Sequence, residues 1–477
     1  AAVLAVALAA EGDGVCAAGG DGGCEAQAAW RTKRDEFWKG LRQHGLEIKL
    51  TSKTFEEKAP SGKGTVTRNG MVLTKDVFYG RSIVKIPRHA LLSIETAQPL
   101  ELRRELHEFL FEKQTLAKAF NVTGEDAAHL LSLAYPLIAM NRDPASVFRE
   151  WLDELSAERL TVLELTPRQR RVLKGTTVDG AYEEMSRNRD LIRQTAGNLS
   201  FFSTAPVGKA EASWAIAVIM RHARVVHPHQ DVRERRHPRM YLFPFRELRN
   251  VSLHPDAGVA LPFQEEIILD GKREQEVVVQ IAKRDMPKGE EIFLWPGRMS
   301  NSELIVRHGL RFDKNPVGIG RNVTQPPNWN DNKESNIRKE YDKHDCSSLE
   351  SFELRFTTAG SPTRTFVRCY RVSWFLTNGW YSPAMVKRRR ELERWPPPEK
   401  YGKDDWLAWT QADQELNRVL LEYCRDMRDR LKDSMDSELA EEFRKSKDPL
   451  DKLLWQLRGE ESRTFKECMN RAKNVVV

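Results

Sequence analysis

The sequence contains few cysteines and lacks an apolar segment long enough to cross a membrane. Its six cysteines, in 477 residues, include no Cys-x-x-Cys pair and have no histidine nearby at metal-ligand spacing. A zinc site therefore has no support, no metal is expected, and a reducing compartment is the default. The apolar run over residues 1–10 is too short to span a bilayer, so no membrane span is predicted.

The sequence also lacks a strong excess of charge of one sign. Its net charge of +7 is the small difference between 76 basic and 69 acidic residues, which are interspersed along the chain. Two basic clusters, at 233–239 and 387–390, are predicted to be solvated surface, with an anionic partner as the alternative. Nucleic-acid binding is not expected, because it would need a contiguous basic face with exposed aromatic side chains.

The N-terminal region has the composition of a targeting segment. The apolar run at 1–10 is followed by a Gly-rich acidic stretch, which predicts a presequence remnant or an arm ordered by a partner. Import into an organelle, a plastid or a mitochondrion, is expected, with the cytosol as the alternative. Four Asn-x-Ser/Thr sequons, at Asn121, Asn198, Asn250 and Asn322, would matter only in a secretory lumen, and chance produces several in a chain this long.

What the chain does contain is a hydrophobic pattern whose period changes along its length. An amphipathic helix is predicted at 30–46, followed by a β-rich block with a turn at Asn69-Gly70 and a strand at 82–87. Between about 100 and 224, apolar residues recur at helical spacing. Strands are predicted again at 241–245, 266–269 and 277–282, with Asp270-Gly271 as a hairpin turn.

The last third of the chain begins with a polar, Pro- and Asn-rich stretch that follows Asn315-Pro316 and predicts a linker up to about 348. A hairpin is predicted from the alternating segments 352–356 and 365–370. Apolar stripes at 416–431 and 450–457 then predict packed helices, since neither is long enough for a coiled coil.

These patterns predict an α+β fold in which a helical insertion splits a β-rich core and a mostly helical C-terminal domain follows. At this length, two or three structural units are expected. The predicted regions are an N-terminal extension (1–29), the first half of the core with its leading helix (30–99), the helical insertion (100–240), the second half of the core (241–316), a linker (317–348) and the helical C-terminal domain (349–477).

Local sequence motifs add a family resemblance to this order of parts. They are the string from Gly70 to Val77 that closes at Ile86-Pro87, the helix end Leu173-Lys174-Gly175-Thr176, the pair Trp214-Ala215, and Gly297 followed by Ser300-Asn301. Together they cover about 46–316 and resemble the SET-domain class that includes the Rubisco large-subunit methyltransferase and the actin-histidine methyltransferase. The C-terminal helices, especially 453–468, resemble that family's substrate-binding domain.

The resemblance implies methyl transfer from S-adenosylmethionine to a lysine or histidine nitrogen, for which the protein mainly aligns the reactants in a water-poor channel. Four implied cofactor or catalytic features depart from the family pattern. Gly70 keeps one glycine of a Gly-x-Gly turn at the cofactor, with an ordinary β-turn as the alternative. His222 stands where the family has an arginine beside the cofactor's charged end. It could hydrogen-bond a carboxylate, or be a surface or core histidine.

The other two departures lie in the second half of the core. Asn250 could still contact adenosine, whereas Val251 replaces a hydrogen-bonding histidine. Pro296 occupies the place of the catalytic tyrosine and has neither a hydroxyl nor an N–H.

These changes predict a catalytically degenerate SET protein that acts as a protein-binding or structural subunit through its C-terminal domain, in an organellar complex. S-adenosylmethionine is the implied cofactor, and the same changes leave its loss open. The alternative is an active S-adenosylmethionine-dependent protein N-methyltransferase with a rearranged site.

Overall fold

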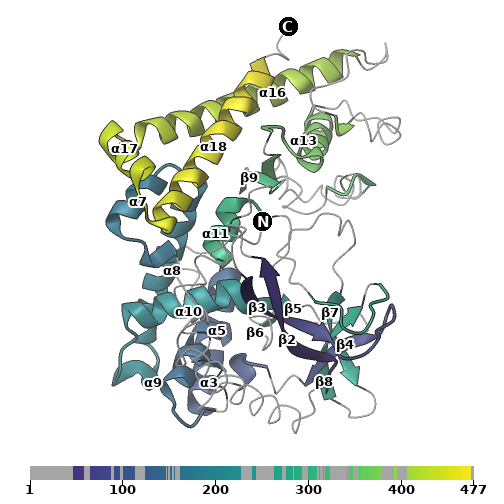
Figure 1. Cartoon of the computed structure of the whole chain (residues 1–477), viewed down its shortest axis with the longest axis vertical. Coiled ribbons are helices and arrows are strands. Elements are labelled where there is room, and N and C mark those ends of the chain that lie inside the picture. The colour runs from purple at the N-terminus through teal and green to yellow at the C-terminus, as the bar shows by residue number, and fades with distance from the viewer. Residues whose placement is uncertain are drawn as a thin grey trace.

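The computed structural model combines small antiparallel sheets with many helices, which confirms the predicted α+β class (Figure 1). It describes residues 47–58, 65–87, 91–96, 100–112, 124–146, 148, 151–152, 155, 162–226, 239–242, 263–270, 275–282, 284–292, 299–308, 311, 315, 317–322, 341, 343–346, 353–357, 359–378, 392–394 and 406–473. The helix predicted at 30–46 and the N-terminal extension lie outside these ranges. No helix within them combines the length and the apolar character that a bilayer crossing requires.

A four-stranded antiparallel sheet joins two segments that lie far apart in the sequence. Its order is β1-β4-β8-β7, and its strands are β1 (Glu47–Ile48), β4 (Ser82–Pro87), β7 (Phe263–Asp270) and β8 (Gln275–Ala282). Since β4 pairs with β8, the chain before and after the helical region meets in one sheet. β7 and β8 form the predicted hairpin, which ends at the pair Asp270↔Gln275.

A long hairpin beside this sheet corrects one prediction. It consists of β2 (Leu50–Lys58) and β3 (Thr65–Leu73). Asn69 and Gly70, predicted as a turn, lie inside β3, opposite Thr54 and Lys53. The turn prediction is wrong because β2 and β3 pair without a break along the whole of both strands, and this pairing overrides the local preference of an Asn-Gly pair.

The helical region predicted between about 100 and 224 is confirmed. Its elements are η2 (Ile94–Thr96), α3 (Leu100–His107), the π-helical turn η3 (Glu108–Glu112), α5 (Gly124–Arg142), η4 (Val162–Glu164), α7 (Pro167–Leu173), α8 (Thr177–Ala196), α9 (Ser200–Ser203) and α10 (Lys209–His222). Residues 131–140 of α5 are all buried, and Tyr135 donates a hydrogen bond to the Ile192 carbonyl of α8 at 2.8 Å. A single apolar core therefore runs through α5, α8 and α10.

Two small antiparallel strand pairs and five further helices follow. The strand pairs are β5 (Ala223–Val226) with β6 (Arg239–Leu242), and β9 (Val317–Asn322) with β10 (Glu353–Thr357). The helices are α11 (Asn301–His308), α13 (Arg364–Thr377), α16 (Trp406–Asp433), α17 (Ser437–Lys445) and α18 (Pro449–Lys473). The helices predicted from the two apolar stripes are thus confirmed.

The hairpin predicted from 352–356 and 365–370 is half wrong. Its first segment is β10, which pairs with β9 instead, and its second segment lies in α13. Phe366, Cys369 and Val372 are all buried on this helix, and their spacing of three residues is helical. A window of six residues is too short to separate that period from alternation.

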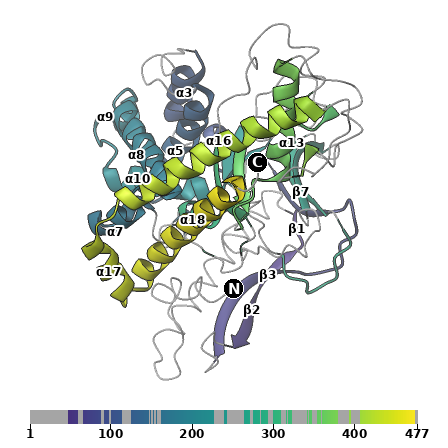
Figure 2. The ribbon, with the colours of Figure 1, turned by 90° about the horizontal axis from the view of Figure 1, so that it is seen from above.

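The C-terminal helices share the core of the helical region. Figure 1 shows α17 and α18 against α7, and Figure 2 shows α16 and α18 side by side. Phe443 of α17 and Leu454 of α18 belong to the same buried cluster as the interior of α5 and α10. Arg458 of α18 donates to the carbonyls of Val172 at 2.9 Å and Lys174 at 2.8 Å. These contacts fix the C-terminal part to the helical region.

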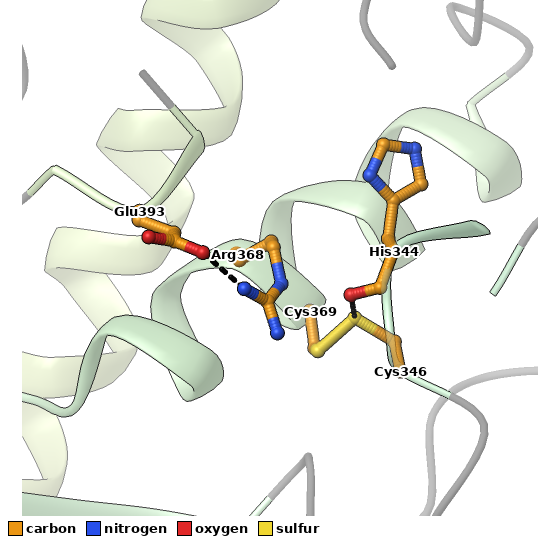
Figure 3. Close-up of a disulfide and its surroundings, with 5 residues drawn as sticks. All are labelled: His344, Cys346, Arg368, Cys369 and Glu393. Atoms are coloured by element: carbon orange, nitrogen blue, oxygen red, sulfur yellow. Dashed lines mark hydrogen bonds and ion pairs between the residues drawn. A yellow bond between two sulfur atoms is a disulfide. The ribbon is translucent and has the colours of Figure 1, made fainter. Parts of the chain in front are cut away.

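Four of the six cysteines form two disulfides. Cys346 pairs with Cys369 of α13 (Figure 3), and Cys424 of α16 pairs with Cys468 of α18. The expectation of reduced thiols is wrong for these four residues. It rested on the lack of close cysteine pairs in the sequence, whereas the partners are 23 and 44 residues apart and meet only through the packing of the helices.

Candidate functional site

The strand that carries Gly70 pairs with a segment from the second half of the core. Directly after the buried Gly70, the Met71 carbonyl accepts a hydrogen bond from the Ile292 N–H at 2.8 Å. Two residues further on, the Leu73 N–H donates to the Glu290 carbonyl at 3.0 Å. Ile292, which precedes Pro296 by four residues in the sequence, therefore lies beside the strand of Gly70.

Side chains lock this pairing at the turns that follow β3 and β8. Asp76 accepts a hydrogen bond from the Lys288 N–H at 2.7 Å, and Asp285 accepts one from the Tyr79 N–H at 2.7 Å. Each carboxylate thus ties its own turn to the backbone of the other. These two hydrogen bonds fix the position of β3 relative to the segment that follows β8, although the bonded residues lie about 200 positions apart in the sequence.

His222 is placed by α10, which runs through the core. The helix begins where Glu211 accepts the Gly208 N–H at 2.8 Å and bonds Arg142 at 2.7 Å. The hydrogen bond from Arg142 lowers the pKa of Glu211. The next turns of α10 are almost entirely buried, and the helix ends at His222, which is 6% exposed. The surface alternative for His222 is therefore wrong, because its side chain is buried at the end of α10.

Tyr241 is a residue near the site that the sequence patterns did not single out. It lies on β6 opposite Arg224, two residues beyond His222, and its side chain is fully buried. It packs in the same apolar cluster as Met71, the neighbour of Gly70. Its neighbour Leu242 belongs instead to the helical core, so β6 links the surroundings of His222 and of Gly70. In the sequence, the only feature that could have singled out Tyr241 is the phenol group itself.

Ser300 and Asn301 of the family motif begin α11. The Ser300 N–H donates to the Glu303 carboxylate at 2.6 Å, and the Ser300 hydroxyl accepts the Glu303 N–H at 3.2 Å. This reciprocal pair is a capping box. Asn301 donates to Glu460 of α18 at 2.9 Å. Both side chains are buried, and these bonds cap the helix and dock α18.

The arrangement matches solved structures closely enough to define the fold. A crystal structure of the SET domain of LSMT bound to methyl-lysine and AdoHcy covers 92% of this chain and 91% of its own, with a TM-score of 0.52 at 12% identity. A structure of Rubisco LSMT bound to AdoMet has a TM-score of 0.51 over the same shares of the two chains, also at 12% identity. The chain has a SET fold. The resemblance seen in the sequence is confirmed at this level.

Sequence relatives of this SET fold are distant. The actin-histidine N-methyltransferase of Rhinolophus ferrumequinum is 21% identical over 294 residues, which cover 59% of this chain and 44% of that protein. The enzyme of the same name from Canis lupus familiaris is 22% identical over the same shares. The chain thus spans less than half the length of these curated relatives. No family model matches it.

Only part of the cofactor site that a SET fold implies lies in the described ranges. Asn250, Val251 and Pro296 lie outside them. Of the other two, Gly70 sits in mid-strand instead of the implied turn, and His222 is a buried histidine in place of an arginine. Gly70 and His222 thus differ from the implied contacts in backbone conformation and in side-chain type, respectively. Within the same ranges, no group of three His, Cys, Asp or Glu side chains is placed to hold a metal ion.

Proposed function

We propose that this SET-fold chain is a protein-binding subunit that has lost methyl transfer. The sequence carries the first support. A methyltransferase of this kind must orient an incoming amine or imidazole in line with the methyl group. Pro296, at the family's tyrosine position, brings no hydroxyl and no N–H to that task.

The family motif that begins α11 gives structural support. Asn301 bonds Glu460, and Ser302 bonds Glu461, both on α18. Arg311 adds a bond to the same Glu460 at 3.1 Å. The polar side chains of this segment thus bond the C-terminal helix to the core. Such bonds are what a rigid scaffold requires.

The exposed face of α18 suggests the chemistry of the partner. One row along this helix is exposed, and it consists of Lys452, Gln456, Gly459, Arg463, Lys466 and Asn470. The row is about 27 Å long at 1.5 Å per residue, and it carries three positive charges and no acidic residue. The four acidic residues of α18 lie beside or behind this row: Asp451 and Glu461 are buried, Glu460 bonds Arg311, and Glu467 is half-buried against Gly360. An acidic protein surface complements this row.

The alternative is an active S-adenosylmethionine-dependent N-methyltransferase. It is favoured by solved structures of the same fold, in which LSMT is bound to AdoMet, or to AdoHcy and lysine. The buried Tyr241, packed in the cluster of Met71, would then be the phenol to test first.

A methylation assay on the full chain separates the two functions. The subunit proposal expects no transfer of radiolabelled methyl from S-adenosylmethionine to any protein of a cell extract. The Pro296→Tyr variant tests whether Pro296 causes the loss of methyl transfer. Methyl transfer by this variant would show that it does. Methyl transfer by the unmodified chain, lost in Tyr241→Phe, would establish the alternative.

Two glycines provide a matched test of the α18 row. A Cβ added at Gly459 of α18 or at Gly180 of α8 would meet no atom within 4 Å, and both positions are exposed on helices. Gly459→Glu should release an acidic protein that co-purifies with the chain, because the added carboxylate repels the acidic partner and offsets the positive charge of the row. Gly180→Glu should retain it. Equal retention by both variants would exclude the α18 row as the binding face.

A further inference from the structure

The two disulfides lie where only a folding chain could form them. All four half-cystines, Cys346, Cys369, Cys424 and Cys468, are 0% exposed. Their Cα atoms are 5.5 and 6.3 Å apart, within the range that a disulfide spans. Because the sulfurs are sealed once the helices have packed, oxidation must take place while the chain folds. Its compartment of folding is therefore one that forms disulfides.

In a secretory compartment of this kind, a sequon on the protein surface can be glycosylated. Asn198-Leu199-Ser200 is the sequon whose three residues all lie in described ranges. It forms the corner between α8 and α9, where Asn198 and Ser200 are exposed and Leu199 is buried. The apolar residue anchors the corner, and the Asn198 side chain stays at the surface.

The local hydrogen bonds are compatible with a glycan. The Asn198 amide donates to the Thr195 carbonyl at 3.3 Å, and a glycosylated amide nitrogen keeps one hydrogen for that bond. Ser200 is held by the Glu105 carboxylate, which accepts the Ser200 N–H at 3.0 Å. The corner therefore keeps its shape after modification.

We propose that this chain folds in a secretory-type lumen and carries an N-linked glycan on Asn198. The transfer joins Asn198 Nδ2 to the anomeric carbon of a lipid-diphosphate-linked oligosaccharide. The bond from that carbon to the diphosphate oxygen breaks, and the lipid diphosphate leaves with one amide proton. For each cysteine pair, two electrons and two protons pass to a disulfide of a lumenal oxidoreductase, which becomes a dithiol. Neither step depends on whether the chain transfers methyl groups.

The test uses the full chain from its native cells, alkylated at lysis in a denaturant, because the buried sulfurs would be protected in the folded chain whether paired or not. Mass spectrometry should find the four paired cysteines protected until a reductant is added. An N-glycosidase should shift the mobility of the chain and leave aspartate at position 198. Four cysteines alkylated without a reductant, or an unmodified Asn198 peptide from the native chain, would overturn the proposal.

Three variants expressed in the same cells assign the glycan. Asn198→Gln and Ser200→Ala should each reduce the glycosidase shift by one glycan. Ser200→Thr keeps the sequon and the hydroxyl, so it should retain the shift. A shift that persists unchanged in Asn198→Gln would place the glycan on another residue and refute the assignment.

Discussion

The Glu461 carboxylate of α18 accepts the backbone N–H of Thr177, the first residue of α8, at 3.0 Å. The two residues are 284 positions apart. The hydroxyls of Thr177 and Ser302 bond the same carboxylate. A single buried side chain thus caps one helix, contacts the start of α11 and ties both to the C-terminal part of the chain. Its charge state bears on the stability of the whole assembly of helices.

Stability should depend on the protonation of Glu461. Burial raises its pKa above the ordinary value of 4.5, against the hydrogen bonds from Ser302 and Thr177 and the charge of Arg458. A carboxyl whose pKa rises on folding favours the folded state below 4.5, and this contribution is lost as the pH rises through the folded pKa. Glu461→Gln should therefore flatten the fall in urea midpoint as the pH rises from 4.5.

The control for Glu461 changes a donor and leaves the carboxyl in place. Thr177→Val removes one hydroxyl that bonds the ionised group, so the pH dependence of its urea midpoint should be steeper than that of the parent. Identical slopes for the parent and Glu461→Gln would show that another group governs stability in this range.

Asp451 should give a pH dependence of the opposite sign. Burial alone would raise its pKa, but hydrogen bonds from Arg168, Ser446 and Gln169 outweigh burial and lower the pKa below 3.8. The stabilisation is therefore present above pH 3.8 and is lost as the pH falls through the folded pKa. Asp451→Asn should lower the free energy of unfolding by about 1 to 2 kcal/mol at neutral pH, and the difference should shrink in acid.

Glu442 supplies the comparison for Asp451. Its carboxylate bonds the same Arg168 at 2.6 Å but is 51% exposed, against 2% for Asp451. Glu442→Gln should change the free energy of unfolding by less than about 0.5 kcal/mol. A loss as large as that of Asp451→Asn would show that burial does not determine the strength of these pairs.

Gly175 should tolerate no side chain. Its φ of +80° is left-handed, and an added Cβ would lie 2.8 Å from the Arg430 carbonyl oxygen of α16. Gly175→Ala should lower the free energy of unfolding by more than about 1 kcal/mol, from backbone strain and the clash together. Gly180→Ala, at an open position inside α8, should raise it by up to about 1 kcal/mol. Denaturant titration of both variants tests this contrast.

Much of the fold could be predicted from the sequence because long periodic segments reveal their own structure. The stripes of α16 and α18 are long enough to give an unambiguous period. The errors occurred where distant pairing decided the outcome. Gly70 follows a strong turn residue, yet β2 holds it in a strand, and the six residues at 365–370 are helical because α13 buries Phe366 and Cys369.

The candidate site was less predictable than the fold. The family motif singled out Ser300 and Asn301 but did not predict that they begin a helix, although a serine three residues before a glutamate is a capping-box pattern. It did not reveal that Asn301 bonds Glu460, because that contact depends on how α18 packs. The same limit hid both disulfides, and it left the burial of His222 open until α10 was seen in the core.

Removing the disulfides one at a time should show how much each contributes to the free energy of unfolding. Replacing both cysteines of a pair with alanine should lower the free energy of unfolding by about 2 to 5 kcal/mol. The Cys424–Cys468 pair closes 44 residues and the Cys346–Cys369 pair closes 23. In the chain-entropy model each doubling of the loop adds about 0.6 kcal/mol, so the longer loop should have the larger effect. Urea titration of both double variants measures the two losses. Variants as stable as the parent under oxidising conditions would mean that the native chain does not carry these bonds.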